Sequence, residues 1–254
     1  PSQSSAASDV YKRQSLYLAL TYKKQVFRSF YNLGFPGFFG GFILSLGFSS
    51  YVFAMYNTTV ANANFIIQTQ TIFLAIFGYF FLKEKISAIT LTSIILAISG
   101  ILLMVGSSLS PGQMSGNIAA FIMPISFATL ILVVRKYPTV DMVPAQFVAG
   151  IFALLIGYLM SEKIMISTND IFLGFLAGFL QLGLGFIFIT IGAQRTPSAM
   201  VGIIMLTEAV LGPLWAWLFI NEQPPFIVII GGSIVIFAVL LQFYNLYTSE
   251  RKAI

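Results

Sequence analysis

Long stretches without any charged residue constrain this chain more than any other feature of its sequence. A helix that spans a membrane needs about 20 apolar residues, because each residue rises about 1.5 Å through a hydrocarbon core of roughly 30 Å. Four stretches without Asp, Glu, Lys or Arg are long enough for one or two such helices, at residues 29–82, 86–134, 171–194 and 223–249. The sequence therefore predicts an integral membrane protein that contacts the lipid bilayer along most of its length.

Composition excludes several classes of function. Charged residues make up 8% of the chain, whereas a soluble domain carries about 25%. The chain has no Cys and no His, which removes disulfides, thiol nucleophiles and most zinc or haem sites, so we expect no metal and no cofactor. The net charge of +5 comes from short basic clusters between apolar spans. Such clusters indicate loops at a membrane surface, and we expect no nucleic-acid partner.

The first residues differ from the rest of the chain. Residues 1–14 are small and polar and then carry Asp9, Lys12 and Arg13, so we interpret them as a non-native or disordered leader. The apolar run at 15–22 is too short to span a bilayer. We interpret it as the tail of a helix that begins before this sequence.

Turn and polar signals divide the remainder into eight predicted helices. Asn57-Thr58-Thr59, Tyr137-Pro138 and Arg195-Thr196-Pro197 are typical breaks, since they combine polar groups or proline with the ends of apolar runs. The predicted fold class is all-α, a multi-pass transmembrane helix bundle with helices at about 35–56, 59–82, 86–106, 117–134, 142–160, 171–193, 198–220 and 226–247.

The distribution of basic residues predicts the orientation. If the cluster at 23–28 is cytoplasmic and the chain then alternates, only Lys163 falls outside. The cytoplasmic side then holds Lys23, Lys24, Arg28, Lys83, Lys85, Arg135, Lys136, Arg195, Arg251 and Lys252. Basic residues concentrate on the cytoplasmic side of membrane proteins. We therefore predict a cell membrane protein, in the bacterial inner membrane, with a cytoplasmic C-terminal tail at 248–254.

An internal repeat appears when the chain is compared with itself at a shift of 138 residues. Residues 34–105 then match 172–243 without a gap, with fifteen identities in seventy-two positions, where composition alone would give roughly five. Leu44–Phe48 falls on Leu182–Phe186, Thr69 on Thr207 and Glu84 on Glu222. The predicted orientation places Glu84 inside and Glu222 outside, so the two copies have opposite topology, which is typical of secondary transporters.

The repeat also predicts the domain organisation. The second copy, at 111–247, has five predicted helices, whereas the first, at 15–110, has three and the short apolar run. An odd number of helices in each copy inverts the next one, so we expect the intact fold to hold five plus five helices, of which this chain contains three plus five. Association of two chains into a homodimer is left open by the sequence.

Two matching segments carry a resemblance to a known family. Ile76–Glu84 and Leu214–Glu222 each end the fourth helix of a copy with an apolar run followed by Glu. This pattern resembles the EamA-type transporters of the drug/metabolite transporter superfamily, here truncated at the N-terminus. The family usually has Gly just before that Glu, where this chain has Lys83 and Asn221. The resemblance implies ten helices, cytoplasmic termini and efflux of amino acids or other metabolites.

Glu208 is the main candidate site residue, because it is the only acidic residue well inside a predicted span. A carboxylate at the centre of a bilayer costs roughly 2.5–3.5 kcal/mol even on insertion scales. Glu208 could carry a proton or bind a substrate amine. Alternatively, it could be a protonated carboxyl that is hydrogen-bonded to Thr207 or to a backbone carbonyl.

A polar stripe on the 59–82 helix supplies further candidates. Asn64, Gln68 and Thr71 are spaced i, i+4, i+7 and share one helical face. They could line a substrate path or join helices by hydrogen bonds. Gln70, which the repeat pairs with Glu208, is off this stripe, and the sequence does not decide which face lines the cavity.

The remaining candidates lie in the second copy. Gln181 is in the middle of a predicted span, where an unpaired amide would be costly. Trp215 lies one to two turns beyond Glu208 and could wall the site through cation–π contact. Glu84 and Glu222 are interpreted as structural, helping to start the helix that follows each of them.

These observations predict a secondary transporter, an exporter of small neutral, zwitterionic or cationic metabolites such as amino acids, which works by alternating access. Glu208 makes protons a candidate coupling ion, and the sequence leaves the coupling ion open. Strongly anionic cargo is disfavoured because no predicted span contains Lys or Arg. The alternatives are an uncoupled facilitator of the same fold and a non-transporting membrane scaffold or sensor. An enzyme is not expected, since no convergent catalytic cluster is visible.

Overall fold

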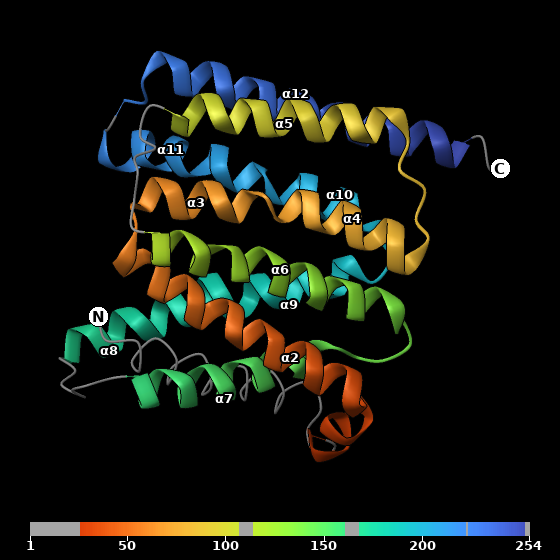
Figure 1. The fold of residues 1–254 in the computed structure, drawn as a ribbon, viewed down its shortest axis with the longest axis vertical. Coiled ribbons are helices and arrows are strands. Elements are labelled where there is room, and N and C mark those ends of the chain that lie inside the picture. Colours follow the sequence, from red (N-terminus) through yellow and green to blue (C-terminus); the bar gives the residue numbers. More distant parts are fainter. Residues whose placement is uncertain (1–25, 107–113, 161–167, 222, 252–254) are drawn as a thin grey trace. The chain divides into compact units, whose positions relative to one another are not determined.

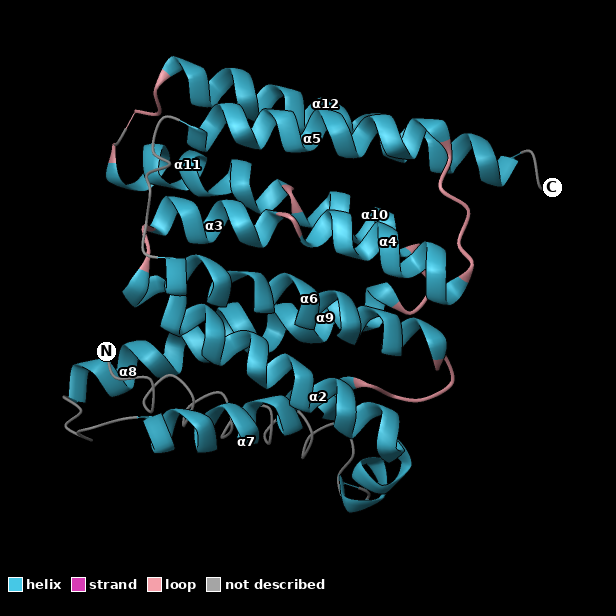
Figure 2. Ribbon diagram, viewed as in Figure 1, coloured by secondary structure: helices cyan, strands magenta, loops and turns pink. Residues whose placement is uncertain are grey.

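The computed structural model describes residues 26–106, 114–160, 168–221 and 223–251. Every regular element in those ranges is a helix (Figure 2). In chain order they are α2 (Val26–Asn57), α3 (Val60–Gln68), α4 (Gln70–Leu82), α5 (Ala88–Val105), α6 (Met114–Lys136), α7 (Val143–Met160), α8 (Thr168–Leu176), the π-helix η3 (Ala177–Gly183), α9 (Leu184–Ala193), α10 (Ser198–Met205), α11 (Thr207–Ile220) and α12 (Phe226–Arg251).

The eight predicted helices are all found, and the predicted fold class is confirmed. In the described ranges, six helical segments are long and apolar enough to cross a membrane, and Ala88–Met104 and Leu184–Ala193 are shorter apolar helices. Three predicted helices are interrupted. The 59–82 helix is α3 and α4, the 198–220 helix is α10 and α11, and the 171–193 helix contains η3. The chain is a multi-pass helical membrane protein. The leader at 1–14 and the apolar run at 15–22 lie outside the described residues.

Helix α2 begins earlier than the sequence predicts because it consists of two pieces. Gly34 has a φ of 59° and a ψ of −174°, which separates residues 26–33 from the longer piece that follows. Glycine adopts this conformation without steric cost. Pro36 then lies in the first turn of the second piece, where its missing amide has no helical partner to lose. The predicted start at residue 35 is the start of this second piece.

The contacts divide the chain into two compact units, and each contains helices from both sequence copies. Unit 1 consists of residues 1–52 and 129–195, and unit 2 consists of residues 53–128 and 196–254. In unit 1, α2 packs on α7 and α9 through edge-on phenylalanine pairs, Phe42 with Phe152 and Phe48 with Phe186. The buried amide of Gln146 donates to the Thr190 hydroxyl at 2.8 Å and joins α7 to α9.

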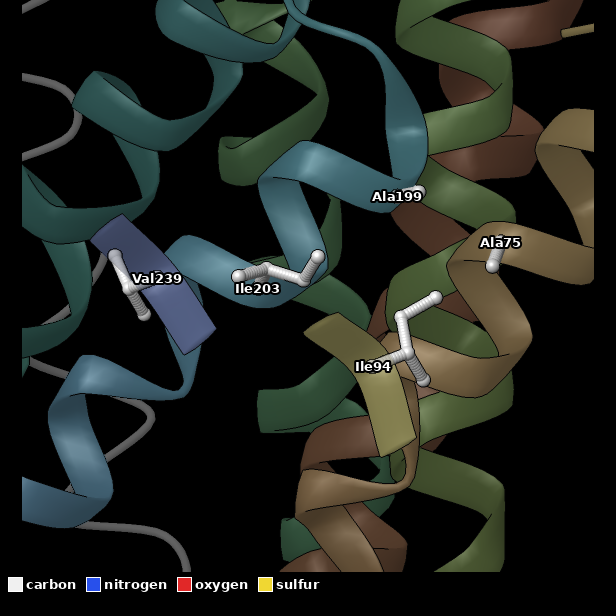
Figure 3. Packing of buried hydrophobic residues seen from close by; sticks show 5 residues of the cluster. All are labelled: Ala75, Ile94, Ala199, Ile203 and Val239. Carbon is white, nitrogen blue, oxygen red and sulfur yellow. The ribbon is translucent and has the colours of Figure 1, made fainter. Parts of the chain in front are cut away.

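Unit 2 has two pairs of closely packed helices. Helix α5 packs along α12, and α10 packs along α4 (Figure 1). One buried cluster connects all four helices, with Ala75 on α4, Ile94 on α5, Ala199 and Ile203 on α10 and Val239 on α12 (Figure 3). Ala75 of α4 and Ala199 of α10 are small, which lets these two helix backbones approach in the way that membrane helices favour.

Helices α5 and α12 approach each other closely at Gly100 and Gly231. A methyl group on Gly231 would lie 2.5 Å from the carbonyl oxygen of Gly100. We expect Gly231→Ala to lower the free energy of unfolding by about 1–3 kcal/mol, because the backbones must separate to admit the methyl group. Thermal unfolding of the purified protein in detergent measures the change.

Gly192→Ala is the matched control for this prediction. A methyl group there would meet nothing within 4 Å, and alanine favours a helix by roughly 1 kcal/mol over glycine. The control should be as stable as the parent chain or more stable. Equal stability of Gly231→Ala and Gly192→Ala would contradict the packing described for α5 and α12.

Candidate functional site

The first break in a spanning helix is at Thr69, between α3 and α4. The Thr69 amide donates to the carbonyl of Ile66 at 3.0 Å, three residues back instead of the four of an α-helix. The Thr69 hydroxyl donates to the same Ile66 carbonyl at 2.5 Å. Threonine hydroxyls that bond back to the preceding turn bend helices. The local cause of the break is therefore a threonine that competes for the backbone acceptors of its own helix.

The second break, between α10 and α11, has the same chemistry. The Leu206 amide donates to the carbonyl of Ile203 at 3.2 Å, again three residues back. The Thr207 hydroxyl donates to the carbonyl of Ile204 at 2.7 Å. Under the 138-residue shift Thr207 falls on Thr69, and Ile204 falls on Ile66. The two breaks are thus equivalent in the repeat, and we call them the paired helix breaks.

The break at Leu206 changes how a buried carbonyl is satisfied. In a continuous helix the Leu206 amide would bond to Gly202, four residues back. Because that amide bonds to Ile203 instead, the Gly202 carbonyl accepts the hydroxyl of Thr71 at 3.0 Å. Thr71 is 0% exposed. Gly202 permits the approach, because a Cβ atom there would lie 2.8 Å from the Thr71 Cα. Helices α4 and α10 are therefore joined next to the breaks.

Glu208 lies in the first turn of α11, directly after the second break. The amide ends of helices carry partial positive charge, which stabilises a carboxylate there. The side chain is exposed on the described chain and has no hydrogen-bond partner among the described residues. Its repeat mate, Gln70, is the first residue of α4 and is buried. The paired helix breaks place both residues at the start of a half-helix.

The other predicted candidates differ in exposure. Gln68 is buried and its Oε1 has no donor among the described residues, whereas Asn64 is exposed. The break at Thr69 separates Gln68 from Thr71, so the predicted stripe is not one uninterrupted helical face. Thr207 makes the second break. Trp215 is half exposed, and its ring lies 5.5 Å from that of Phe219.

Gln181 falls within the π-helix η3, where the Leu184 amide donates to the Phe179 carbonyl five residues back. Its side chain lies outside the described residues. Short π-helical insertions inside α-helices occur frequently at functional sites. The backbone therefore adds an independent reason to keep Gln181 as a candidate, which neither hydropathy nor spacing could have supplied.

Two polar groupings of unit 2 were not predicted from sequence. Thr58 donates to the Asn117 side chain at 2.6 Å, and the Asn62 amide group lies 3.3 Å from the same oxygen, which ties the start of α3 to α6. Glu84 accepts from the amide of Ser198 at 2.9 Å, although it was predicted to help start the helix that follows it. The side chain of Ser87 caps that helix by accepting from the Thr90 amide. Both groupings join residues far apart in sequence.

Comparison with known proteins agrees with this architecture. A family model described as "EamA-like transporter family" matches residues 15–106 and again 111–244. A protein of Clostridium kluyveri named as an uncharacterized transporter is 26% identical over 239 residues, which cover 87% of this chain and 74% of that protein. A solved crystal structure superposes with a TM-score of 0.79 at 17% identity, over 94% of this chain and 86% of that one. That last likeness shows the fold alone.

The contact between Thr71 and Gly202 gives a direct prediction. Thr71→Val keeps the shape of the side chain but removes its donor, so the freed Gly202 carbonyl loses its partner. We expect unfolding to become easier by about 1–3 kcal/mol, the cost of an unsatisfied buried acceptor. Thermal unfolding in detergent measures it. Thr71→Ser keeps the hydroxyl and should recover most of the loss, and a Val variant as stable as the Ser variant would argue against the bond.

Proposed function

Because the chain belongs to the EamA-like transporter family, we propose that it is a secondary transporter that exports small neutral, zwitterionic or cationic metabolites, such as amino acids, by alternating access. The paired helix breaks are the observation that carries this proposal. Transporters with inverted repeats commonly interrupt one helix in each repeat near the middle of the membrane, where substrate and coupling ions bind. Thr69 and Thr207 interrupt equivalent helices of the two copies at equivalent residues.

The groups beside the breaks favour a substrate that donates hydrogen bonds. Glu208 offers a carboxylate that has no partner among the described residues, and Gln68 has a buried oxygen that accepts no donor. No Lys or Arg lies inside the predicted spans to neutralise an anion. An ammonium group of an amino acid or an amine would satisfy these acceptors, since hydrogen bonds to charged groups are the stronger ones. Strongly anionic cargo would find no counter-charge here.

We propose protons as the coupling ion and the cell membrane as the location, from two separate sets of residues. A carboxylate that is reached from one side at a time can exchange a proton as well as a substrate amine, so Glu208 would couple export to protons. The basic residues at the predicted cytoplasmic loops support a cell membrane location with a cytoplasmic C-terminus. An uncoupled facilitator would share the fold but would not need this carboxylate.

Replacement of Glu208 by Gln tests the substrate and coupling roles together. The protein in proteoliposomes would be assayed with a panel of labelled amino acids and amines, with and without a pH gradient. We expect the gradient to drive transport by the parent chain. Glu208→Gln should lose that dependence and lower uptake about ten-fold or more, because a hydrogen bond to a charged group contributes roughly 1.5–3 kcal/mol.

Asp141→Asn is the matched control, since this acidic residue lies before α7 and its side chain accepts from the amide of Val143 at 3.0 Å. It should transport like the parent chain. If Glu208→Gln retained the pH dependence of the parent, the proton-coupling role would be wrong. If no member of the panel moved in the parent chain, the proposed substrate class would be wrong.

A further inference from the structure

We propose that Glu84 is a latch that holds the end of α4 to the start of α10 and thereby keeps one end of the transport path closed. This inference rests on the proposed alternating-access function and adds a residue that controls it. Glu84 and Ser198 lie 114 positions apart in sequence and both belong to unit 2. The latch consists of the Glu84 carboxylate and the amide and hydroxyl of Ser198.

The geometry at the end of α4 aims Glu84 at α10. Lys83 has a φ of 57° and ends the helix in the left-handed conformation, and the Glu84 amide then donates to the Gly78 carbonyl at 3.0 Å. This is the usual way in which a helix ends by reversing the chain. The reversed carboxylate accepts from the Ser198 amide with Oε2 at 2.9 Å and lies 3.3 Å from the Ser198 hydroxyl with Oε1.

Helix α10 uses this distant carboxylate because its own N-cap residue makes no side-chain cap bond. The residue before α10 is Pro197, which has no side-chain acceptor. Its repeat mate before α3 is Thr59, whose hydroxyl accepts from the Asn62 amide at 3.1 Å. The first amides of a helix need an acceptor, and a carboxylate also interacts favourably with the helix dipole. One copy therefore caps its broken helix locally, and the other receives its cap from the end of α4.

Close packing surrounds the latch on the α4 side. A methyl group on Gly78 would lie 2.5 Å from Oε2 of Glu84 and 3.0 Å from the Cβ of Ser198, so glycine is required for the contact. Ala75, one turn before Gly78 on α4, and Ala199, the residue after Ser198 on α10, belong to the same buried cluster (Figure 3). All residues from Ser198 to Ile203 are buried. Helices α4 and α10 are therefore packed together from the latch to the paired helix breaks.

The repeat mates of these helices are arranged differently. Among the described residues, α3 and α11 do not form the packed interface that α4 and α10 form. Asn64 is exposed although its mate Gly202 is buried, and Gly212 is exposed although its mate Leu74 is buried. A repeat that alternates between two states should show this difference within one state. To open the closed end, α4 must leave α10, and the bonds of Glu84 to Ser198 must break.

The absence of cysteine from the chain permits a direct test of the latch. Ala75→Cys introduces a single thiol at a position that is 6% exposed between α4 and α10. Its rate of reaction with N-ethylmaleimide is measured for the full chain in membrane vesicles without substrate. We expect Glu84→Ala to raise the rate by about ten-fold or more, because loss of a charge-assisted hydrogen bond shifts a two-state equilibrium by roughly that factor. Glu84→Gln keeps an acceptor and should be intermediate.

Ser198→Pro removes the donor instead of the acceptor. Proline is well tolerated at the first position of a helix, and Pro197 already has the extended backbone that must precede it. This variant should react with N-ethylmaleimide as fast as Glu84→Ala. It also provides a second test of the latch if Glu84→Ala fails to fold. Asp141→Ala removes a carboxylate that caps the helix beside it and should leave the rate unchanged.

Two results would overturn the latch. One is labelling of both Glu84→Ala and Ser198→Pro at the rate of the Ala75→Cys background. The other is an equal increase in Asp141→Ala, which would indicate general loosening. The measurement needs no substrate, so it separates the two proposals. If Glu84→Ala and Ser198→Pro label fast but the parent chain transports no substrate, the proposed function alone is wrong. If the parent chain transports substrate but both variants label at the background rate, the latch alone is wrong.

Discussion

The structure depends on the requirement that backbone amides and carbonyls inside a membrane find partners within the protein, because lipid offers none. Continuous helices satisfy this automatically, and a broken helix does not. At each break a threonine hydroxyl bonds to the preceding turn, and at Gly202 the carbonyl that the break releases is taken by Thr71 of another helix. The second break therefore depends on the close packing of α4 and α10. The two breaks place Glu208 and Gln70 at the starts of half-helices.

The two copies have kept the same break but differ in the residues around it. Thr69 and Thr207 are identical in type, and their hydroxyls bond to equivalent carbonyls, whereas the residues before the two broken helices, Thr59 and Pro197, differ. Gly202 is matched by Asn64, which is too large for an equally close approach. A carrier built from such copies need not have two states of equal energy. The small residues and the carboxylate at the α4–α10 end favour closure there.

Much of this architecture could be predicted from the sequence, because hydropathy and turn residues act locally. The eight spans and the repeat follow from such patterns, and Gly34 and Pro36 explain why a predicted start fell inside α2. The breaks could not be predicted, since threonine is common in unbroken membrane helices. The contact from Glu84 to Ser198 spans 114 positions and leaves no local signal. Lys83 and Asn221 both have a φ of 57°, a left-handed conformation that glycine adopts most easily.

The central claim is that the two copies cross the membrane in opposite directions, as the inverted repeats of secondary transporters do. Reporter fusions test it most directly. A periplasmic reporter and a cytoplasmic reporter would each be joined after Lys85 and after Glu222, which lie in the matching loops of the two copies. The account predicts that the cytoplasmic reporter is active after Lys85 and the periplasmic reporter after Glu222. Activity of the same reporter at both positions would contradict it.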